Sequence, residues 1–220
     1  MGIIHFSAPK NLITSICEKT EIKNFIETGT YKGGTALWAA SLFQHVYTIE
    51  IDAETSTKVK ESENCPKNIE FIVGNSRDQL PLLIQRITGR SFFWLDGHWC
   101  WGDAGIEDEC PLLEELGAIA AMHDAIIFID DARCFLGPPP APHIAEKWPK
   151  IDEIFALLHQ QFPDHTTTII DDVIISYPKD VKKVIENYWK DTFDERYNQP
   201  AVQQDKEPTI LQRIINKFSR

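Results

Sequence analysis

Two short acidic motifs in this chain contain residues that could do metal or acid–base chemistry. Asp96 and His98 end the apolar run "FFWLDGH", and Asp130 and Asp131 end the later run "AIIFIDD". If both runs are neighbouring parallel strands, their carboxyl ends meet at one edge of the sheet. Carboxylates that lie close together repel each other unless a cation lies among them, and their hard oxygens suit Mg²⁺ or Mn²⁺. The pattern therefore indicates a metal site at Asp96, Asp130 and Asp131.

Each of these residues also has an ordinary interpretation. Asp131 could cap a turn, and Asp96 could accept backbone N–H bonds. His98 has an imidazole that ionises near pH ~6.5, so it could remove a proton from a hydroxyl at neutral pH or ligate the metal. The ordinary alternative for His98 is a packed ring beside Trp99. The sequence leaves these roles open.

A glycine-containing loop, "ETGTYKGGT", follows the first apolar strand. Gly29 and Gly33 permit a tight strand-to-helix turn and let backbone N–H groups approach a ligand. If Gly33 is the third glycine of a dinucleotide-binding G-x-G-x-x-G motif, Thr30 stands where the second should be, which compromises a close approach to pyrophosphate. The loop therefore favours a ligand without phosphates.

Polar residues end the first three strands as well. Glu27 ends the first strand, and Glu50 ends the second, where a carboxylate can accept both hydrogens of a ribose diol. Asn75 follows the third strand and could hydrogen-bond an adenine edge, and Ser76 with Gln79 has the spacing of a capping box. Taken singly, each residue has an ordinary role: Glu27 as a partner of a helix dipole, Glu50 as a solvated strand end and Asn75 as a turn residue. Their succession at consecutive strand ends favours a nucleoside site.

The order of elements predicts a doubly wound, mostly parallel α/β sheet with a terminal antiparallel strand pair. Five apolar strands are expected within 23–29, 45–52, 68–75, 91–96 and 125–131, with helices between them, and the pair lies in "HTTTIIDDVIISYP". We expect one domain over residues 1–190, with a Pro-rich site loop at 133–149. Trp99, Trp101, Phe135, His143 and Trp148 could form an apolar wall or lid there, although tryptophans are equally at home in a core.

The last part of the chain carries less information. Residues 191–208 are polar and expected to be poorly ordered, within a tail at 191–220. The tail ends in "TILQRIINKFSR", a basic amphipathic stretch. A docked terminal helix is the favoured interpretation, and packing on a second copy in a homo-oligomer or on a membrane surface are the alternatives.

Composition excludes several classes of function. The 220 residues carry a formal net charge of -11, so no phosphate-neutralising surface for nucleic acid is expected. No run is long enough to span a bilayer, and no basic-then-apolar leader opens the chain. The five cysteines form no CxxC pair and are odd in number, which predicts reduced thiols in the cytoplasm.

The motifs "FIETGTYKGGT", "VYTIEID" and "FIVGNSRDQLP" resemble those of class I S-adenosylmethionine-dependent methyltransferases over roughly residues 20–178. The resemblance implies S-adenosyl-L-methionine as the cofactor. Its amino-acid part would lie on the first loop, its ribose at the second strand and its adenine at the third. The implied contacts are Glu27, Gly29, Thr30, Gly33, Glu50, Asn75 and Ser76, with Asn75 replacing the Asp of many members.

"WLDGH" and "FIDDAR" are similar to a narrower group, the metal-dependent sugar O-methyltransferases of the macrocin and novobiocin pathways. That resemblance implies Asp96, Asp130 and Asp131 as ligands of Mg²⁺ or Mn²⁺, and His98 as the base in place of an Asp. It further implies O-methylation of a sugar or a glycosylated small molecule. The alternatives are an NAD-dependent oxidoreductase, a binding or scaffold protein that keeps the fold without turnover, and a metal-dependent hydrolase.

Overall fold

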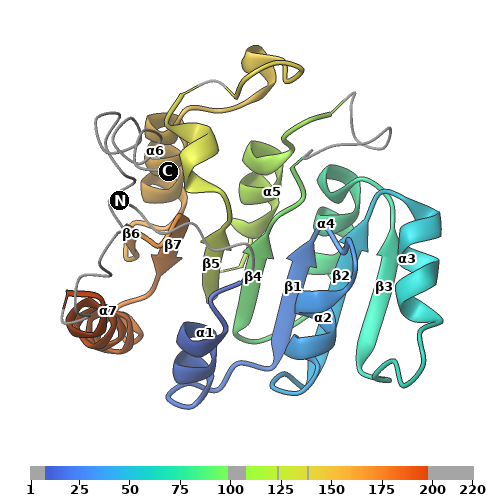
Figure 1. Ribbon diagram of the computed structural model, residues 1–220, viewed down its shortest axis with the longest axis horizontal. Coiled ribbons are helices and arrows are strands. Elements are labelled where there is room, and N and C mark those ends of the chain that lie inside the picture. The colour runs from blue at the N-terminus through green and yellow to red at the C-terminus, as the bar shows by residue number, and fades with distance from the viewer. Residues whose placement is uncertain (1–7, 99–107, 123, 138, 198–220) are drawn as a thin grey trace, which may run out of the picture. The chain divides into compact units, whose positions relative to one another are not determined.

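The computed structural model describes residues 8–98, 108–122, 124–137 and 139–197, and these form a mixed sheet flanked by helices (Figure 1). The strands are β1 Asn24–Thr28, β2 His45–Glu50, β3 Ile69–Val73, β4 Ser91–Leu95, β5 Ala125–Ile129, β6 Thr166–Ile170 and β7 Val173–Tyr177. The helices are α1 Lys10–Cys17, α2 Gly34–Ala39, α3 Ala53–Lys60, α4 Ser76–Ile84, α5 Leu112–Ile119, α6 Ile151–Gln161 and α7 Lys182–Tyr197.

The sheet confirms the predicted topology. Its strand order is β3-β2-β1-β4-β5-β7-β6, with β1 to β5 parallel. β7 runs antiparallel to both β5 and β6. As a result, the start of β7 and the turn that precedes it lie at the same edge as the carboxyl ends of β1, β2, β4 and β5. That edge is where ligands bind on such sheets.

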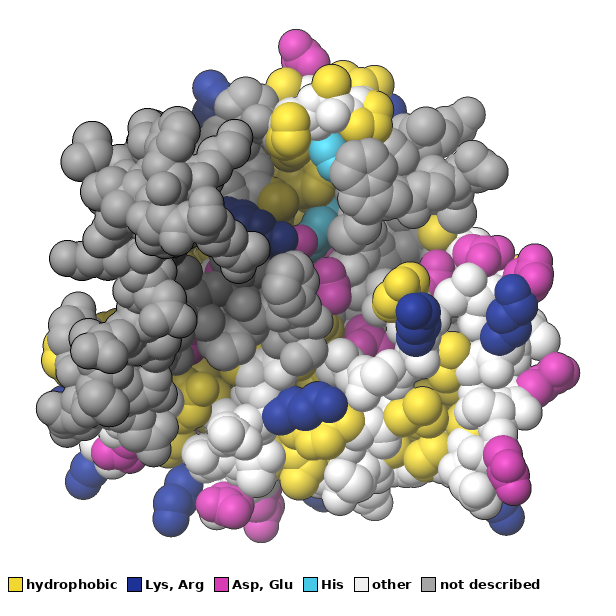
Figure 2. Space-filling view, in the orientation of Figure 1, with side chains coloured by type: hydrophobic (Ala, Val, Ile, Leu, Met, Phe, Trp, Pro, Cys, Tyr) yellow, Lys and Arg dark blue, Asp and Glu magenta, His cyan; other side chains and the backbone are white. Residues whose placement is uncertain are grey.

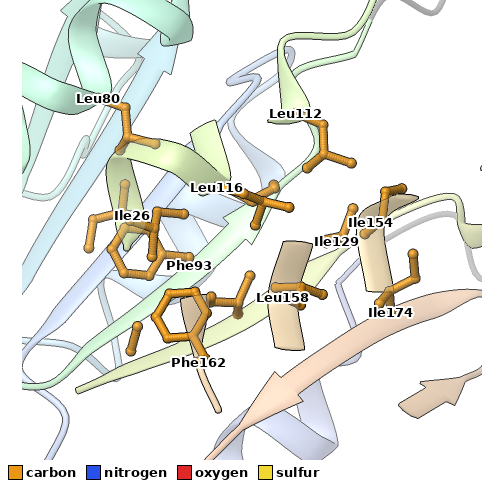
Figure 3. Packing of buried hydrophobic residues seen from close by; sticks show 14 of the residues in the cluster. Ile26, Leu80, Phe93, Leu112, Leu116, Ile129, Ile154, Leu158, Phe162 and Ile174 are labelled. Atoms are coloured by element: carbon orange, nitrogen blue, oxygen red, sulfur yellow. The ribbon is translucent and has the colours of Figure 1, made fainter. Parts of the chain in front are cut away.

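Both faces of β4 and β5 are buried, which explains why these two strands are apolar along nearly their whole length rather than alternating. On one face, Phe25 stacks on Phe92, and Phe92 packs against Phe128 with ring centroids 4.7 Å apart. The opposite face, built around Ile26 and Phe93, packs against α4, α5 and α6 (Figure 3). Each fully buried Phe or Ile stabilises the fold by roughly 1.5–3 kcal/mol.

Three local expectations need correction. The capping box at Ser76 is wrong, because Asn75 is the N-cap of α4 and its side chain accepts the Arg77 N–H. The segment from 133 to 149 is not wholly irregular, since 3-10 helices form at Ala132–Phe135 and Ala145–Lys147. Residues 191–197 are helical in α7, where Trp189 and Phe193 are one turn apart with ring centroids at 5.8 Å.

The chain divides into two units, residues 1–186 and 187–220. The first contains the whole sheet, and Leu12, Val181 and Ile185 are among its buried residues. Trp99, Trp101 and the segment 209–220 lie outside the described residues. None of the helices in the described residues is long and apolar enough to cross a membrane.

Candidate functional site

The polar residues predicted from the sequence do gather along the carboxyl edge of the sheet. Glu27 is in β1, Glu50 ends β2, and Asp96 and Asp130 directly follow β4 and β5. Figure 2 shows imidazole, acidic and basic side chains together in a hollow bordered by hydrophobic side chains. The edge therefore brings two groups of residues together, one at β1 and β2 and one at β4 and β5.

The loop after β1 is held against the end of β4 by a glycine. Gly29 has φ 86°, and a Cβ at this position would lie 2.4 Å from the carbonyl oxygen of Asp96. Its N–H donates to the carbonyl of Ile49 at 2.9 Å. Gly33 also has a positive φ, and a Cβ there would collide with Val59. Only glycine fits at both places, so the loop presents bare backbone at the edge.

Glu50 ties the end of β2 to this loop. One carboxylate oxygen accepts the N–H groups of Thr30 at 3.0 Å and Tyr31 at 2.9 Å, and the other accepts that of Asp52 at 3.1 Å. Glu50 ends β2 as its position in the sequence predicts, but its bonds to the loop were not predictable from the sequence. A carboxylate has about four acceptor positions, so Glu50 can shape the loop and still accept from a ligand diol.

Glu27 lies beneath the loop and is almost fully buried. It accepts the hydroxyl hydrogen of Thr48 at 2.7 Å, and the hydroxyl oxygens of Thr48 and Thr30 are 2.6 Å apart. Burial raises the pKa of Glu27 to about 8, although the Thr48 hydrogen bond opposes this shift. Glu27 therefore holds a proton at neutral pH in the protein without a ligand.

This raised pKa predicts a pH-dependent stability. The unfolded carboxyl loses its proton near pH ~4.5, while the folded one keeps it until about 8, so the free energy of unfolding should fall as pH rises between these values. The slope from this residue is at most about 1.4 kcal/mol per pH unit. Glu27→Gln should flatten that slope in urea unfolding at pH 5, 6.5 and 8. Glu54→Gln, at an exposed position in α3, serves as the control, and an unchanged slope in Glu27→Gln would contradict the buried-proton account.

Asn75 is less available to a ligand than the sequence suggested. Its side-chain oxygen caps α4, and its amide donates to Asp108 at 2.9 Å. Asp108 also accepts from Arg77 at 2.8 Å. Asp108 therefore ties the start of α4 to the segment before α5.

Glu115 on α5 is a further buried acid that the sequence analysis missed. Burial raises the pKa of Glu115 to about 7, against the opposing effect of the Ser76 and Thr28 hydroxyls. Its Oε1 is buried and has no hydrogen-bond partner. A Cβ on Gly97 would lie 3.3 Å from that oxygen. Glu115 therefore lies beside the ends of β1 and β4 and the start of α4. Only its helical i, i+3 spacing with Leu112 could have indicated this inward face from the sequence.

His98 forms a pair with Asp131. Its Nε2 lies 3.0 Å from Asp131 Oδ2 and 4.0 Å from Asp96 Oδ1. Burial of the ring lowers the pKa of His98, but the Asp131 hydrogen bond and the acidic neighbours outweigh it and raise the pKa overall. Asp131 has φ 55°, a left-handed conformation that turns its side chain toward the ring. The pair has the geometry of an oriented acid–base group.

The second oxygen of Asp131 is engaged as well. Arg133 Nη1 lies 2.6 Å from Asp131 Oδ1 and also contacts Asp172 in the β6–β7 turn. Burial alone would raise the pKa of Asp131, but the hydrogen bond from His98 and the charge of Arg133 lower it. Asp131 is therefore the ionised member of this group.

The pKa values of Asp96 and Asp130 are raised, in contrast to that of Asp131. Burial, with the charge of Asp131, raises the pKa of Asp96 to about 6, against the opposing effect of His98. Burial and the charges of Asp96 and Asp131 raise the pKa of Asp130 to about 7. The mutual repulsion that the sequence predicted for these carboxylates is therefore present.

The three predicted metal ligands are not arranged as one ligand set. Both oxygens of Asp131 already contact Arg133 and His98. Within the described ranges, no group of three or more His, Cys, Asp or Glu side chains has the arrangement of a metal site. The residues present do not fit a metal held jointly by Asp96, Asp130 and Asp131.

Aromatic rings cover one side of His98. The centroid of Trp148 is 5.4 Å and that of Phe135 6.2 Å from the imidazole centroid. The buried Glu109, which the sequence analysis also missed, accepts the Trp148 indole N–H at 2.8 Å, and its carboxylate lies 3.4 Å from His143 Nδ1. Glu109 thereby fixes part of the Pro-rich loop beside the acid–base pair.

Sequence comparison does not identify a family, because no family model and no curated protein matches the chain. Solved structures do match. Rv0187 from MTB, in a cofactor-bound crystal structure, has a TM-score of 0.52 at 17% identity, covering 79% of this chain and 81% of the other. SMU.1697c from Streptococcus mutans, named as a methyltransferase and bound to SAH, has 0.51 at 13%, covering 78% and 99%.

Human methyltransferase-like protein 13 in complex with SAH has a TM-score of 0.50 at 11% identity, covering 90% of this chain and 95% of the other. The sheet order and the antiparallel β6–β7 pair are those of the class I methyltransferase fold, which these structures share. The chain therefore has the S-adenosylmethionine-dependent methyltransferase fold.

Proposed function

We propose that this protein is an S-adenosylmethionine-dependent O-methyltransferase that acts on a hydroxyl of a sugar or glycosylated small molecule. One observation carries the proposal: the backbone of Gly29 in the first loop lies directly against the carbonyl of Asp96, two residues before His98. The loop suited to the cofactor and the acid–base pair are therefore adjacent. The solved SAH complexes with the same fold support the choice of cofactor.

The residues at β1 and β2 fit the cofactor. Gly29 and Gly33 form a cradle that a Cβ would fill, and Glu50 is the carboxylate beside it for the ribose hydroxyls. Glu27, Thr30, Asn75 and Ser76 are the remaining proposed contacts. Among them Asn75 acts chiefly through the position of α4, because its amide is already bonded on both sides.

The bound cofactor supplies an electrophilic methyl group on a sulfonium. His98 removes the proton of the acceptor hydroxyl, and Asp131 orients the imidazole and stabilises the imidazolium that forms. Trp148 and Phe135 are buried beside His98 and pack edge-on against its imidazole, so they restrict the orientation of the ring. The metal dependence implied by the sequence resemblance enters no step, because both oxygens of Asp131 are already engaged.

The cofactor assignment is tested by calorimetric titration of the purified chain with S-adenosylmethionine, SAH and NAD. The first two should bind, and NAD should not, because the first loop lacks the second glycine of the dinucleotide motif. Glu50→Gln should weaken binding at least about 10-fold, or ~1.4 kcal/mol, because the carboxylate holds both the loop and the diol.

Glu70→Gln is the matched control, since Glu70 is in the neighbouring strand and pairs with Arg86 on the surface. Its affinity should stay within about 2-fold of wild type. Binding of NAD alone, or equal losses in the two variants, would refute the assignment.

A further inference from the structure

The carboxylate cluster at the ends of β4 and β5 consists of Asp96, Asp130 and Asp131, together with Asp172 from the β6–β7 turn. We propose that the guanidinium of Arg133 is the resident cation of this cluster, in the role that a divalent metal would otherwise have. The inference rests on the proposed function only in taking this edge as the site of methyl transfer.

Arg133 is held from two sides. Its Nη1 lies 2.6 Å from Asp131 Oδ1 and contacts Asp172 Oδ2, while its backbone N–H donates to Asp172 Oδ1 at 2.9 Å. The N–H of Ala132 donates to the carbonyl of Asp172 at 2.7 Å. The side chains of Asp131 and Asp172 are largely buried, whereas Arg133 is partly exposed. The β6–β7 turn thus fixes both the backbone and the side chain of Arg133.

The backbone around the guanidinium is preset for this contact. Asp131, Asp171 and Asp172 all have positive φ values, 55°, 50° and 68°, which non-glycine residues adopt only when their surroundings hold them there. The left-handed conformation of Asp131 directs its carboxylate between His98 and Arg133. A metal ligand at Asp131 would have to give up one of these two contacts.

The negative charge of the carboxylate cluster is already partly offset by neighbouring side chains. Arg133 Nη1 lies 2.6 Å from one oxygen of Asp131 and contacts Asp172, and His98 Nε2 lies 3.0 Å from the other oxygen of Asp131. A divalent ion placed among these residues would be repelled by a guanidinium that is already paired there. The guanidinium of Arg133 therefore already offsets the negative charge of Asp131 and Asp172.

A direct measurement of metal binding tests whether Arg133 is the resident cation, and it needs no methyl acceptor. Mn²⁺ is titrated into the full chain without S-adenosylmethionine at pH 7.5, with free Mn²⁺ followed by electron paramagnetic resonance. Wild type should bind with a dissociation constant no tighter than about 1 mM, and Arg133→Gln, which leaves Asp131 and Asp172 without their cation, should bind at least about 10-fold tighter. Arg133→Lys keeps the charge and should behave like wild type.

The matched control is Arg90→Gln. Arg90 also lies between two aspartates, Asp124 at 2.7 Å and Asp180 at 2.6 Å, at the amino end of β4. Like Arg133→Gln, this variant leaves two carboxylates without their arginine partner, but at a place away from the site. It should gain no affinity for Mn²⁺. A gain equal to that of Arg133→Gln would show non-specific binding and overturn the proposal.

Two other results would also overturn it. One is micromolar Mn²⁺ binding by wild type that Asp130→Asn abolishes, and the other is an Arg133→Gln variant that folds and gains nothing. If Arg133→Gln does not fold, the wild-type titration still decides between a resident guanidinium and a metal. S-adenosylmethionine binding is measured on the same samples, so failure of the proposed function is seen separately from the Mn²⁺ result.

Discussion

Gly29→Ala is expected to weaken the affinity for S-adenosylmethionine by more than about 100-fold. The same substitution should lower the free energy of unfolding by roughly 2–4 kcal/mol. The added Cβ would lie 2.4 Å from the Asp96 carbonyl oxygen, on a residue whose φ is 86°. Backbone meets backbone at this contact, so no side-chain rotation can relieve it. Calorimetry and urea unfolding measure the two effects.

Gly34→Ala is the matched control for this prediction. Gly34 is the first residue of α2, five positions further on, and a Cβ there meets nothing within 4 Å. Because alanine favours a helix over glycine, this variant should bind the cofactor normally and be unchanged or slightly more stable. Normal binding by Gly29→Ala would show that the loop does not approach the cofactor.

His98→Ala should lower the rate of methyl transfer by about 10²–10⁴-fold, the usual contribution of a general base. Its affinity for S-adenosylmethionine should change less than about 2-fold, because His98 follows β4 and the cofactor cradle lies at β1 and β2. The measurement is transfer of a labelled methyl group to a panel of glycosides, with the active acceptor then used at saturation.

His165→Ala is the control for the loss of an imidazole. His165 lies near the other end of the sheet, where its Nδ1 is 3.2 Å from the hydroxyl of Ser176. Its methyl-transfer rate should match wild type. An undiminished methyl-transfer rate in His98→Ala would show that His98 is not the general base. It would equally contradict the proposed role of Asp131 in orienting the imidazole.

Much of the fold was predictable because the information is local. Parallel strands buried on both faces are apolar throughout, as in "FFWL" and "AIIFI", and the Asp52 cap of α3 is visible as an acid before a helical stretch. The succession of polar residues at strand ends also predicted that Glu27, Glu50, Asp96 and Asp130 would share one edge. That followed from the sheet topology alone.

The contacts within the site were not predictable, because they join distant segments through precise geometry. Arg133 and Asp172 are 39 residues apart, and their contact depends on left-handed residues in a turn that contains no glycine. Glu109 reads as one more acid before a helix, yet its carboxylate binds Trp148. The sequence predicted a metal among the aspartates because it could not show that an arginine would face them.

The position of β6 and β7 late in the chain determines the order in which the two parts of the site are synthesised. The residues proposed to bind the cofactor all precede β4, whereas Asp172, which holds Arg133 beside Asp131, is made only after β6. Chains are synthesised from the N-terminus, and folding can begin before synthesis ends. The residues proposed to bind the cofactor therefore leave the ribosome before Asp172, and the support of Asp131 through Arg133 can form only after the β6–β7 turn has been made.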